Sequence, residues 1–213
     1  MSKVVLYDYW RSSASYRVRI ALNLLGIDYE AVPIDLTKKA HRSPEHMARN
    51  PQGFVPALEI DGRLLTQSVA ILEYLAETRP DTGLLPEAPA EKARVRALSH
   101  SIAMDIHPIC NLHVVTHVMD LTGEGDAARL AWMQRFIGKG LTAFEAILND
   151  PATGTFCHGD TPGMADCCLV PQIFNARRWK SDISDMPRIN AVMAACEALG
   201  SFADAHPDII GAP

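Results

Sequence analysis

The length, composition and charge of the chain exclude several classes of protein. With 213 residues, 48% of them hydrophobic, it can bury the core of one domain or of two small ones, so a disordered chain is not expected. A formal net charge of -5, with 20 Lys and Arg residues scattered along the sequence, argues against a nucleic-acid surface. Any anionic ligand must therefore be bound by local groups.

The apolar segments and the cysteines narrow the cellular setting. No apolar run approaches a membrane span, and the N-terminus enters a strand pattern without the basic region and cleavage site of a signal peptide. The five cysteines are odd in number and lack CxxC spacing, so neither a disulfide framework nor a zinc ribbon is expected. We predict a cytoplasmic protein with reduced thiols and no contact with a membrane.

Strand and helix patterns alternate at the start of the chain. Residues 4–7 and 29–34 read as strands, and a helical pattern lies between them and stops at Gly26. Two strands that a helix connects in this way are expected to be parallel. Ser43, followed by a proline and an early acid, predicts a short helix that ends near residues 50–51.

A hairpin follows this unit. Residues 55–60 alternate between apolar and polar side chains, residues 61–62 are the Asp-Gly pair of a two-residue turn, and residues 64–65 begin the returning strand. Pro56 opens the first of these strands. Sequence alone favours a trans bond before it, because only a minority of X–Pro bonds are cis.

The predicted elements form two domains. Residues 67–75 have the apolar spacing of a third helix that Ser68 could cap, which completes a mixed four-stranded sheet with helices on both faces. We place this α/β domain at residues 1–82 and a linker rich in proline and glycine at 83–90. An all-α domain is expected over 91–213, with helical patterns at about 90–120, 126–149, 163–179 and 187–198.

The start of the first helix is the most distinctive stretch. Ser12, Ser13 and Ser15 suit a helix start better than a helix interior, because their hydroxyls accept from backbone N–H groups that lack partners there. The first-turn amides and the positive end of the helix dipole would stabilise a thiolate, phosphate or carboxylate. The stretch therefore predicts an anion site.

The chain resembles the cytosolic glutathione transferase family over essentially its whole length. The resemblance lies in the order of the elements, in Val55-Pro56 and in Gln67-Ser68. Residues 12–22 are similar to the zeta-class signature Ser-Ser-Cys-x-Trp-Arg-Val-Arg-Ile-Ala-Leu, and residues 105–111 and 165–172 resemble the bacterial isomerases of that class. The resemblance implies a thioredoxin-like N-terminal domain, an all-helical C-terminal domain, glutathione as cofactor and a homodimer.

Two positions depart from the family pattern. Ala14 stands where zeta enzymes usually carry Cys, which removes thiol chemistry from that position. Gly163 stands where the family's capping box usually has Ser or Thr. Asp166 can still accept from the backbone N–H of Gly163, so we expect modestly lower stability and an intact fold.

The resemblance implies a role for several residues of the N-terminal domain. Ser12 is the expected donor of a hydrogen bond to the glutathione sulfur, and Ser13 is the second candidate because it could be committed to capping. The backbone of Val55 would meet the cysteinyl amide, and a cis bond before Pro56 would orient it. The remaining contacts would come from Gln67 and Ser68 at the γ-glutamyl carboxylate, where simple helix capping is the alternative, and from His41 at the glycine end.

Further candidates lie in the helical domain and beside the serine turn. His107 and Asn111 are expected, by resemblance, to reach glutathione or the substrate, although His107 could instead be a hydrogen-bonded interior histidine. Arg11 and Arg178 are the candidates for two substrate carboxylates, because the guanidinium fork suits them. An ion pair at a solvated helix end is the alternative for Arg178. A metal site along the helix that contains His107 is not expected, since one straight helix cannot present a tetrahedral set of ligands.

The resemblance implies a glutathione-dependent cis-trans isomerase of maleyl keto-acids, small dicarboxylic substrates such as maleylacetoacetate or maleylpyruvate. A thiolate can add to the cis double bond of such an acid, and elimination after rotation returns the trans isomer. One alternative is a zeta-like transferase that conjugates or dehalogenates small α-halo acids. Another is a binding module without catalysis, which retention of Ser12, Gln67 and Ser68 argues against.

Overall fold

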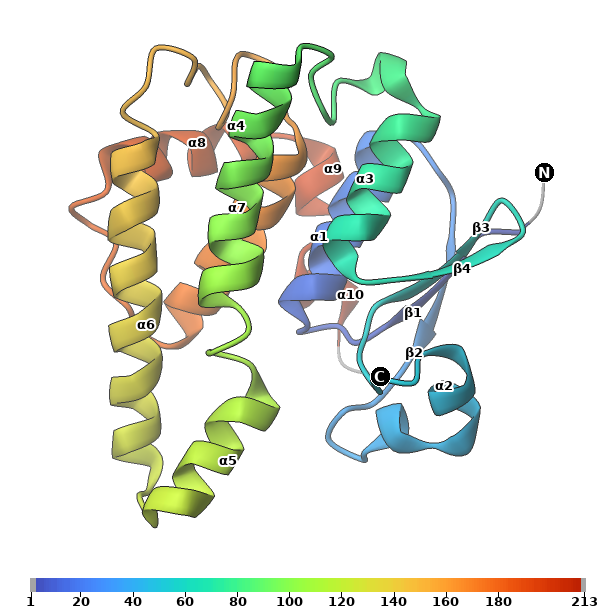
Figure 1. Ribbon diagram of the computed structural model, residues 1–213, viewed down its shortest axis with the longest axis vertical. Coiled ribbons are helices and arrows are strands. Elements are labelled where there is room, and N and C mark those ends of the chain that lie inside the picture. Colours follow the sequence, from blue (N-terminus) through green and yellow to red (C-terminus); the bar gives the residue numbers. More distant parts are fainter. Residues whose placement is uncertain (1–2, 212–213) are drawn as a thin grey trace. The chain divides into compact units, whose positions relative to one another are not determined.

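The computed structural model describes residues 3–211, which form two compact units (Figure 1). One unit contains the chain up to Leu85 together with the segment from Glu197 onward, and the other runs from Pro86 to Cys196. The helical domain was expected over 91–213, whereas the segment from Glu197 onward belongs to the first compact unit.

The first unit contains a four-stranded mixed sheet. The strands lie in the order β2 (Glu30–Pro33), β1 (Val5–Asp8), β3 (Ala57–Ile60) and β4 (Arg63–Thr66). β1 and β2 are parallel, whereas β3 is antiparallel to both β1 and β4. The predicted parallel pair and the predicted hairpin are thus confirmed.

Helices cover both faces of this sheet, as predicted. The guanidinium of Arg49 lies over the ring of Tyr7, 4.3 Å from its centroid, on the face that carries α2. The next residue of β1, Asp8, points to the other face and forms a buried salt bridge with Arg19 of α1. The helical elements of the first unit are α1 (Ser13–Leu24), η1 (Ala40–Arg42), α2 (Pro44–Arg49), α3 (Ser68–Thr78), η2 (Pro80–Thr82), α9 (Gly200–Ala203) and α10 (Pro207–Ile210).

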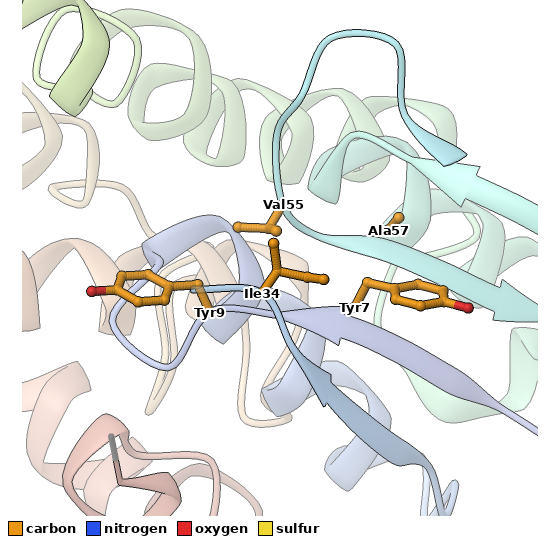
Figure 2. Close-up of a cluster of buried hydrophobic side chains, with 5 residues drawn as sticks. All are labelled: Tyr7, Tyr9, Ile34, Val55 and Ala57. Carbon is orange, nitrogen blue, oxygen red and sulfur yellow. The ribbon is translucent and has the colours of Figure 1, made fainter. Parts of the chain in front are cut away.

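A cluster of buried side chains fills the α2 face (Figure 2). Val55 and Ile34 lie between the two tyrosines of the cluster, whose hydroxyl groups point in opposite directions (Figure 2). The hydroxyl of Tyr7 donates to Glu59, which raises the pKa of the tyrosine. The cluster consists of Tyr7, Tyr9, Ile34, Val55 and Ala57.

Specific hydrogen bonds attach the end of the chain to α1. The Nε of Arg19 donates to the carbonyl of Ala205 at 3.0 Å, and the side-chain amide of Asn23 donates to the carbonyl of Ser201 at 3.1 Å. Phe202 is buried in the same region. These contacts join positions far apart in the sequence, so helical periodicity could not assign the last segment to the first unit.

The second unit is helical, but its first predicted helix is not continuous. The N–H of His107 donates to the carbonyl of Ile102 at 2.9 Å, five residues earlier, which is the spacing of a π turn. Pro108 has no N–H to continue the helix, and Asn111 has an extended backbone. The helices of this unit are α4 (Pro89–His100), the π-helical η3 (Ser101–Ile106), α5 (Leu112–Thr122), α6 (Asp126–Ile147), α7 (Met164–Arg178) and α8 (Pro187–Glu197).

No helix within residues 3–211 combines the length and the apolar character needed to cross a membrane.

Candidate active site

The serine turn caps α1. Ser12 is the N-cap residue, and its Oγ accepts from the N–H of Ser15 at 3.2 Å. The expectation that Ser13 could be the cap is therefore wrong. A hydroxyl that accepts through a lone pair keeps its own hydrogen for donation, so Ser12 can cap the helix and still donate to an anion. The first turn of α1 contains no acidic residue that would compete for this position.

The start of α3 has a different arrangement. Gln67 precedes the helix with a left-handed backbone (φ +68°), and its side chain does not cap the helix. Its Nε2 donates instead to Oε1 of Gln52 at 2.6 Å. Ser68 is the first helical residue, and its Oγ accepts from Nη1 of Arg17 at 3.1 Å. The prediction that Ser68 caps α3 is wrong, and simple capping does not account for this pair of residues.

The peptide bond between Val55 and Pro56 is cis. The trans bond that sequence alone favoured is therefore wrong, whereas the family resemblance implied the cis form. Two buried side chains hold the carbonyl of Phe54, the residue before Val55. This oxygen lies 2.9 Å from Nε2 of His46 in α2, and it accepts from Nδ2 of Asn50, at the end of α2, at 3.0 Å. A carbonyl can only accept, so Nε2 of His46 carries the hydrogen.

Sequence reasoning missed these two side chains. His46 lies inside a short helix and Asn50 at its end, and nothing in a helical pattern indicates that both turn toward the same carbonyl. The only available signal was the pair Asn50-Pro51, which indicated the end of the helix.

Contacts within the first unit connect these segments. Ser12 donates its N–H to the carbonyl of Tyr9 at 2.8 Å, and the ring of Tyr9 belongs to the same cluster as Val55. The loop before Val55 reaches the start of α3 through the bond between Gln52 and Gln67. The structure thus brings together the serine turn, the cis-proline loop and the start of α3.

Arg11 and His41 lie in the same unit. Nη2 of Arg11 donates to the hydroxyl of Tyr9 at 3.1 Å, and its guanidinium lies over the ring of Trp10, 4.6 Å from the centroid. The Nε of Arg11 and the Nδ1 of His41 are buried without a hydrogen-bond partner among residues 3–211. Burial, and then the charge of Arg42, lower the pKa of His41.

The other three candidates belong to the second unit. His107 follows η3 and is partly buried, and the side-chain oxygen of Asn111 lies 3.1 Å from Nδ1 of His113. Arg178 is the last residue of α7, is exposed, and lies over the ring of Trp179 at 5.4 Å from its centroid. In the part of the chain that the structure describes, no group of three or more His, Cys, Asp or Glu side chains is arranged to hold a metal ion.

The start of α7 is satisfied by its own acid. Asp166 accepts from the N–H of Gly163 at 2.8 Å, as predicted, and its other oxygen accepts from the N–H of Cys157 at 2.9 Å. Burial raises the pKa of the Asp166 carboxyl. The carboxylate therefore connects the loop around Cys157 to the helix, which is a structural role.

Comparison with known proteins identifies the family of the chain. The family model described as "Glutathione S-transferase, N-terminal domain" matches residues 2–77, and "Glutathione S-transferase, C-terminal domain" matches residues 130–195. Maleylacetoacetate isomerase of Rhizobium meliloti (strain 1021) is 64% identical over 207 residues, which cover 97% of each chain. The chain belongs to the glutathione S-transferase family.

Solved structures refine the relationship within that family. The holo structure of maleylpyruvate isomerase, a bacterial zeta-class enzyme, is 44% identical with a TM-score of 0.93 and covers 96% of this chain and 97% of its own. Maleylacetoacetate isomerase of Methylobacterium extorquens AM1, solved with malonate and glutathione, is 42% identical with a TM-score of 0.92 and covers 98% and 99%. The expected zeta-class resemblance and the thioredoxin-like plus all-helical fold are confirmed.

Proposed function

We propose that this protein is a glutathione-dependent cis-trans isomerase of maleyl keto-acids, converting maleylacetoacetate or maleylpyruvate to the fumaryl isomer. The observation that carries the proposal is the serine turn. Ser12 caps α1 and keeps a hydroxyl hydrogen to donate, in a chain 64% identical to a maleylacetoacetate isomerase. Glutathione is the cofactor that the proposal requires, and a relative contains it together with a small dicarboxylate.

The residues of the first unit fit glutathione chemically. The start of α3 has no capping side chain and no acidic residue in its first turn, so its amides suit the γ-glutamyl carboxylate. Ser68 adds a hydroxyl at the same place. The cis bond before Pro56 follows Val55, whose preceding carbonyl is held by two buried donors. We assign the glycine end to His41.

Bound glutathione would supply the thiolate that adds to the conjugated double bond. The hydroxyl of Ser12, together with the amides at the start of α1, holds negative charge on sulfur and so lowers the pKa of a thiol placed there. Ser13, which is buried in the first turn, is the second candidate. No proton transfer by the protein is needed to maintain the charge, because a hydrogen bond and the helix dipole suffice.

The substrate carries two carboxylates, and arginine can bind each through parallel N–H groups. Arg11 lies in the turn between β1 and α1, and its buried Nε is a donor without a partner among the described residues. We assign one carboxylate to Arg11 and the other to Arg178. His107 and Asn111 are assigned, by resemblance, to glutathione or the substrate.

The decisive assay mixes the purified protein with maleylpyruvate or maleylacetoacetate, with and without glutathione, and follows the absorbance change of cis-to-trans conversion. Turnover that depends on glutathione supports the proposal, and the ratio of the two kcat/KM values identifies the preferred acid. Absence of turnover with both acids, while glutathione still binds, would contradict it and favour displacement chemistry on α-halo acids.

We also propose a cytoplasmic homodimer, as the resemblance to the zeta class implies. All five cysteines are free and buried, which suits a reducing compartment. Light scattering coupled to size exclusion tests the assembly. A mass of about 23 kDa, the mass of one chain, would contradict the dimer.

A further inference from the structure

A buried arginine lies beside the start of α3. Arg17 is 2% exposed and donates from Nη1 to Oγ of Ser68, which is 6% exposed. The bond connects α1 to the first residue of α3 across 51 positions of sequence. Burying a guanidinium is costly and its charge cannot be removed by deprotonation, so a buried arginine is held by polar contacts such as this one.

We propose that Arg17 is a positioning residue for glutathione, which acts through Ser68 on the γ-glutamyl carboxylate. The inference rests on the proposed function, because that function places the carboxylate at the start of α3. A guanidinium can only donate, so Oγ of Ser68 must be the acceptor of their hydrogen bond. The hydroxyl hydrogen of Ser68 is thereby left for a second acceptor, such as an anion at the helix start.

The charge of Arg17 acts in the same direction as its hydrogen bond. The first turn of α3 contains no acidic residue, and the side chain of Gln67 does not cap it. The helix dipole makes this end positive, and a buried cation adjacent to Ser68 adds to that potential. A carboxylate bound there would meet amides, a fixed hydroxyl donor and a nearby positive charge at once.

Arginine is specifically suited to this role. The planar guanidinium donates to its partner in a fixed direction. A lysine ammonium, in contrast, is a point charge on a flexible stem and does not fix the orientation of its partner. Arg17→Lys should therefore keep the charge and lose the orientation of Ser68. Arg17→Gln should lose both.

The test measures glutathione binding by calorimetry, with two ligands. One is glutathione, and the other is γ-aminobutyryl-cysteinylglycine, which lacks only the α-carboxylate of the γ-glutamyl group and keeps the chain to the cysteine and glycine. Arg17→Gln should weaken binding of glutathione about tenfold or more, because a hydrogen bond to a charged group is lost. It should change binding of the analogue little. Arg17→Lys should fall between Arg17→Gln and the parent.

Two controls separate this role from a structural one. Arg63→Gln makes the same charge change on the exposed part of β4 and should leave both affinities unchanged. Ser68→Ala should remove most of the effect of a second change at position 17, since the two residues act in series. If Arg17→Gln fails to fold, the comparison of Arg17→Lys with Ser68→Ala decides the question in the same way.

Equal weakening of both ligands by the Arg17 variants would overturn the inference, as would a parent protein that binds both ligands equally. These outcomes are independent of the proposed reaction. A protein that discriminates the ligands through Arg17 but does not isomerise maleyl acids would contradict the proposed function alone.

Discussion

The starts of α3 and α7 differ in what can accept from their first N–H groups. Each helix follows a residue whose side chain does not cap it, Gln67 for α3 and Gly163 for α7. In α7 the third helical residue, Asp166, supplies a carboxylate that accepts from the N–H of Gly163. In α3 the corresponding position is Ala70, which is exposed and has no acceptor to offer. The N–H of Gly163 before α7 is therefore paired within the protein, whereas the start of α3 has no acid of its own and suits an external anion.

The buried charge nearby has opposite sign in the two cases. Asp166 is a buried acid that connects α7 to the loop at Cys157, whereas Arg17 is a buried cation next to the first residue of α3. A helix start with its own acid stabilises the fold. A helix start with a cation beside it is prepared for a ligand, at a cost in stability that the ligand can offset.

The start of α1 lies between these cases, and its disruption should have the largest effect. Ser12→Ala removes the hydroxyl donor to the sulfur, so kcat for isomerisation should fall about 10²- to 10³-fold, as for loss of one oxyanion donor. The thiol pKa of bound glutathione, read from thiolate absorbance, should rise. Ser13→Ala is the matched control and should change both far less. Equal effects of the two variants would contradict the assignment of Ser12 as the donor to the sulfur.

Removal of the acid at the start of α7 should mainly lower the stability of the fold. Asp166→Ala leaves the N–H groups of Gly163 and Cys157 without their acceptor, so the free energy of unfolding should fall by about 3 kcal/mol. Urea unfolding measures this change. The kcat of the protein that remains folded should be nearly unaltered, and a loss of activity without a loss of stability would contradict the structural role.

Introduction of an acid at the start of α3 should mainly weaken the binding of glutathione. Ala70→Asp gives α3 the acid that α7 has, and the carboxylate should compete with the γ-glutamyl carboxylate for the same amides. We expect the Kd of glutathione to rise about fivefold, corresponding to roughly 1 kcal/mol at a helix terminus. Ala70→Asn is the neutral control. Tighter binding by Ala70→Asp would show that no anion is bound at this helix start.

The raised pKa of Asp166 predicts a pH dependence with a definite sign. Because the folded protein binds this proton more tightly than the unfolded chain, the resulting stability is present below the unfolded pKa, about 4, and is lost as pH rises through the folded pKa. The free energy of unfolding of the parent, minus that of Asp166→Asn, should therefore decrease with pH and then level off. Urea unfolding of both proteins across this range measures it, and an increase would contradict the sign.

The smallest effect is expected at Gly163, where α7 lacks a capping hydroxyl. Gly163 has an extended backbone that any residue can adopt, and Thr there could complete the capping box with Asp166. Gly163→Thr should raise the free energy of unfolding by a few tenths of a kcal/mol, because glycine is itself a tolerable cap. Thermal melting compares the two proteins. A variant that melts no higher than the parent would show that the missing hydroxyl does not limit stability.

The sequence predicted those features that neighbouring residues decide. The serine turn, the hairpin at residues 61–62 and the bond from Gly163 to Asp166 depend on groups within a few positions of one another. The parallel pairing of β1 with β2 followed as well, since two strands that a helix connects are expected to be parallel. The family resemblance implied the cis bond before Pro56, whereas local preference alone predicted a trans bond.

The roles of individual polar side chains could not be predicted in this way. Ser68 looked like a cap, but its hydroxyl accepts from Arg17, 51 positions away. His46 and Asn50 looked like parts of a short helix, but both hold the carbonyl of Phe54. A periodic pattern shows which face of an element is buried, and it does not show which distant group a buried polar atom will meet.

By itself the sequence determined most elements of this protein, the serine cap of its first helix and its resemblance to the zeta class, because caps, turns and hydrophobic periods are local. Only the tertiary structure decided that the helical pattern over 90–120 breaks at the π turn before His107, that the segment after Glu197 packs on α1, and that a buried cation lies beside Ser68. The last two outcomes depend on contacts between residues distant in sequence, where the cost of burying a polar group is met by whichever partner the fold brings near.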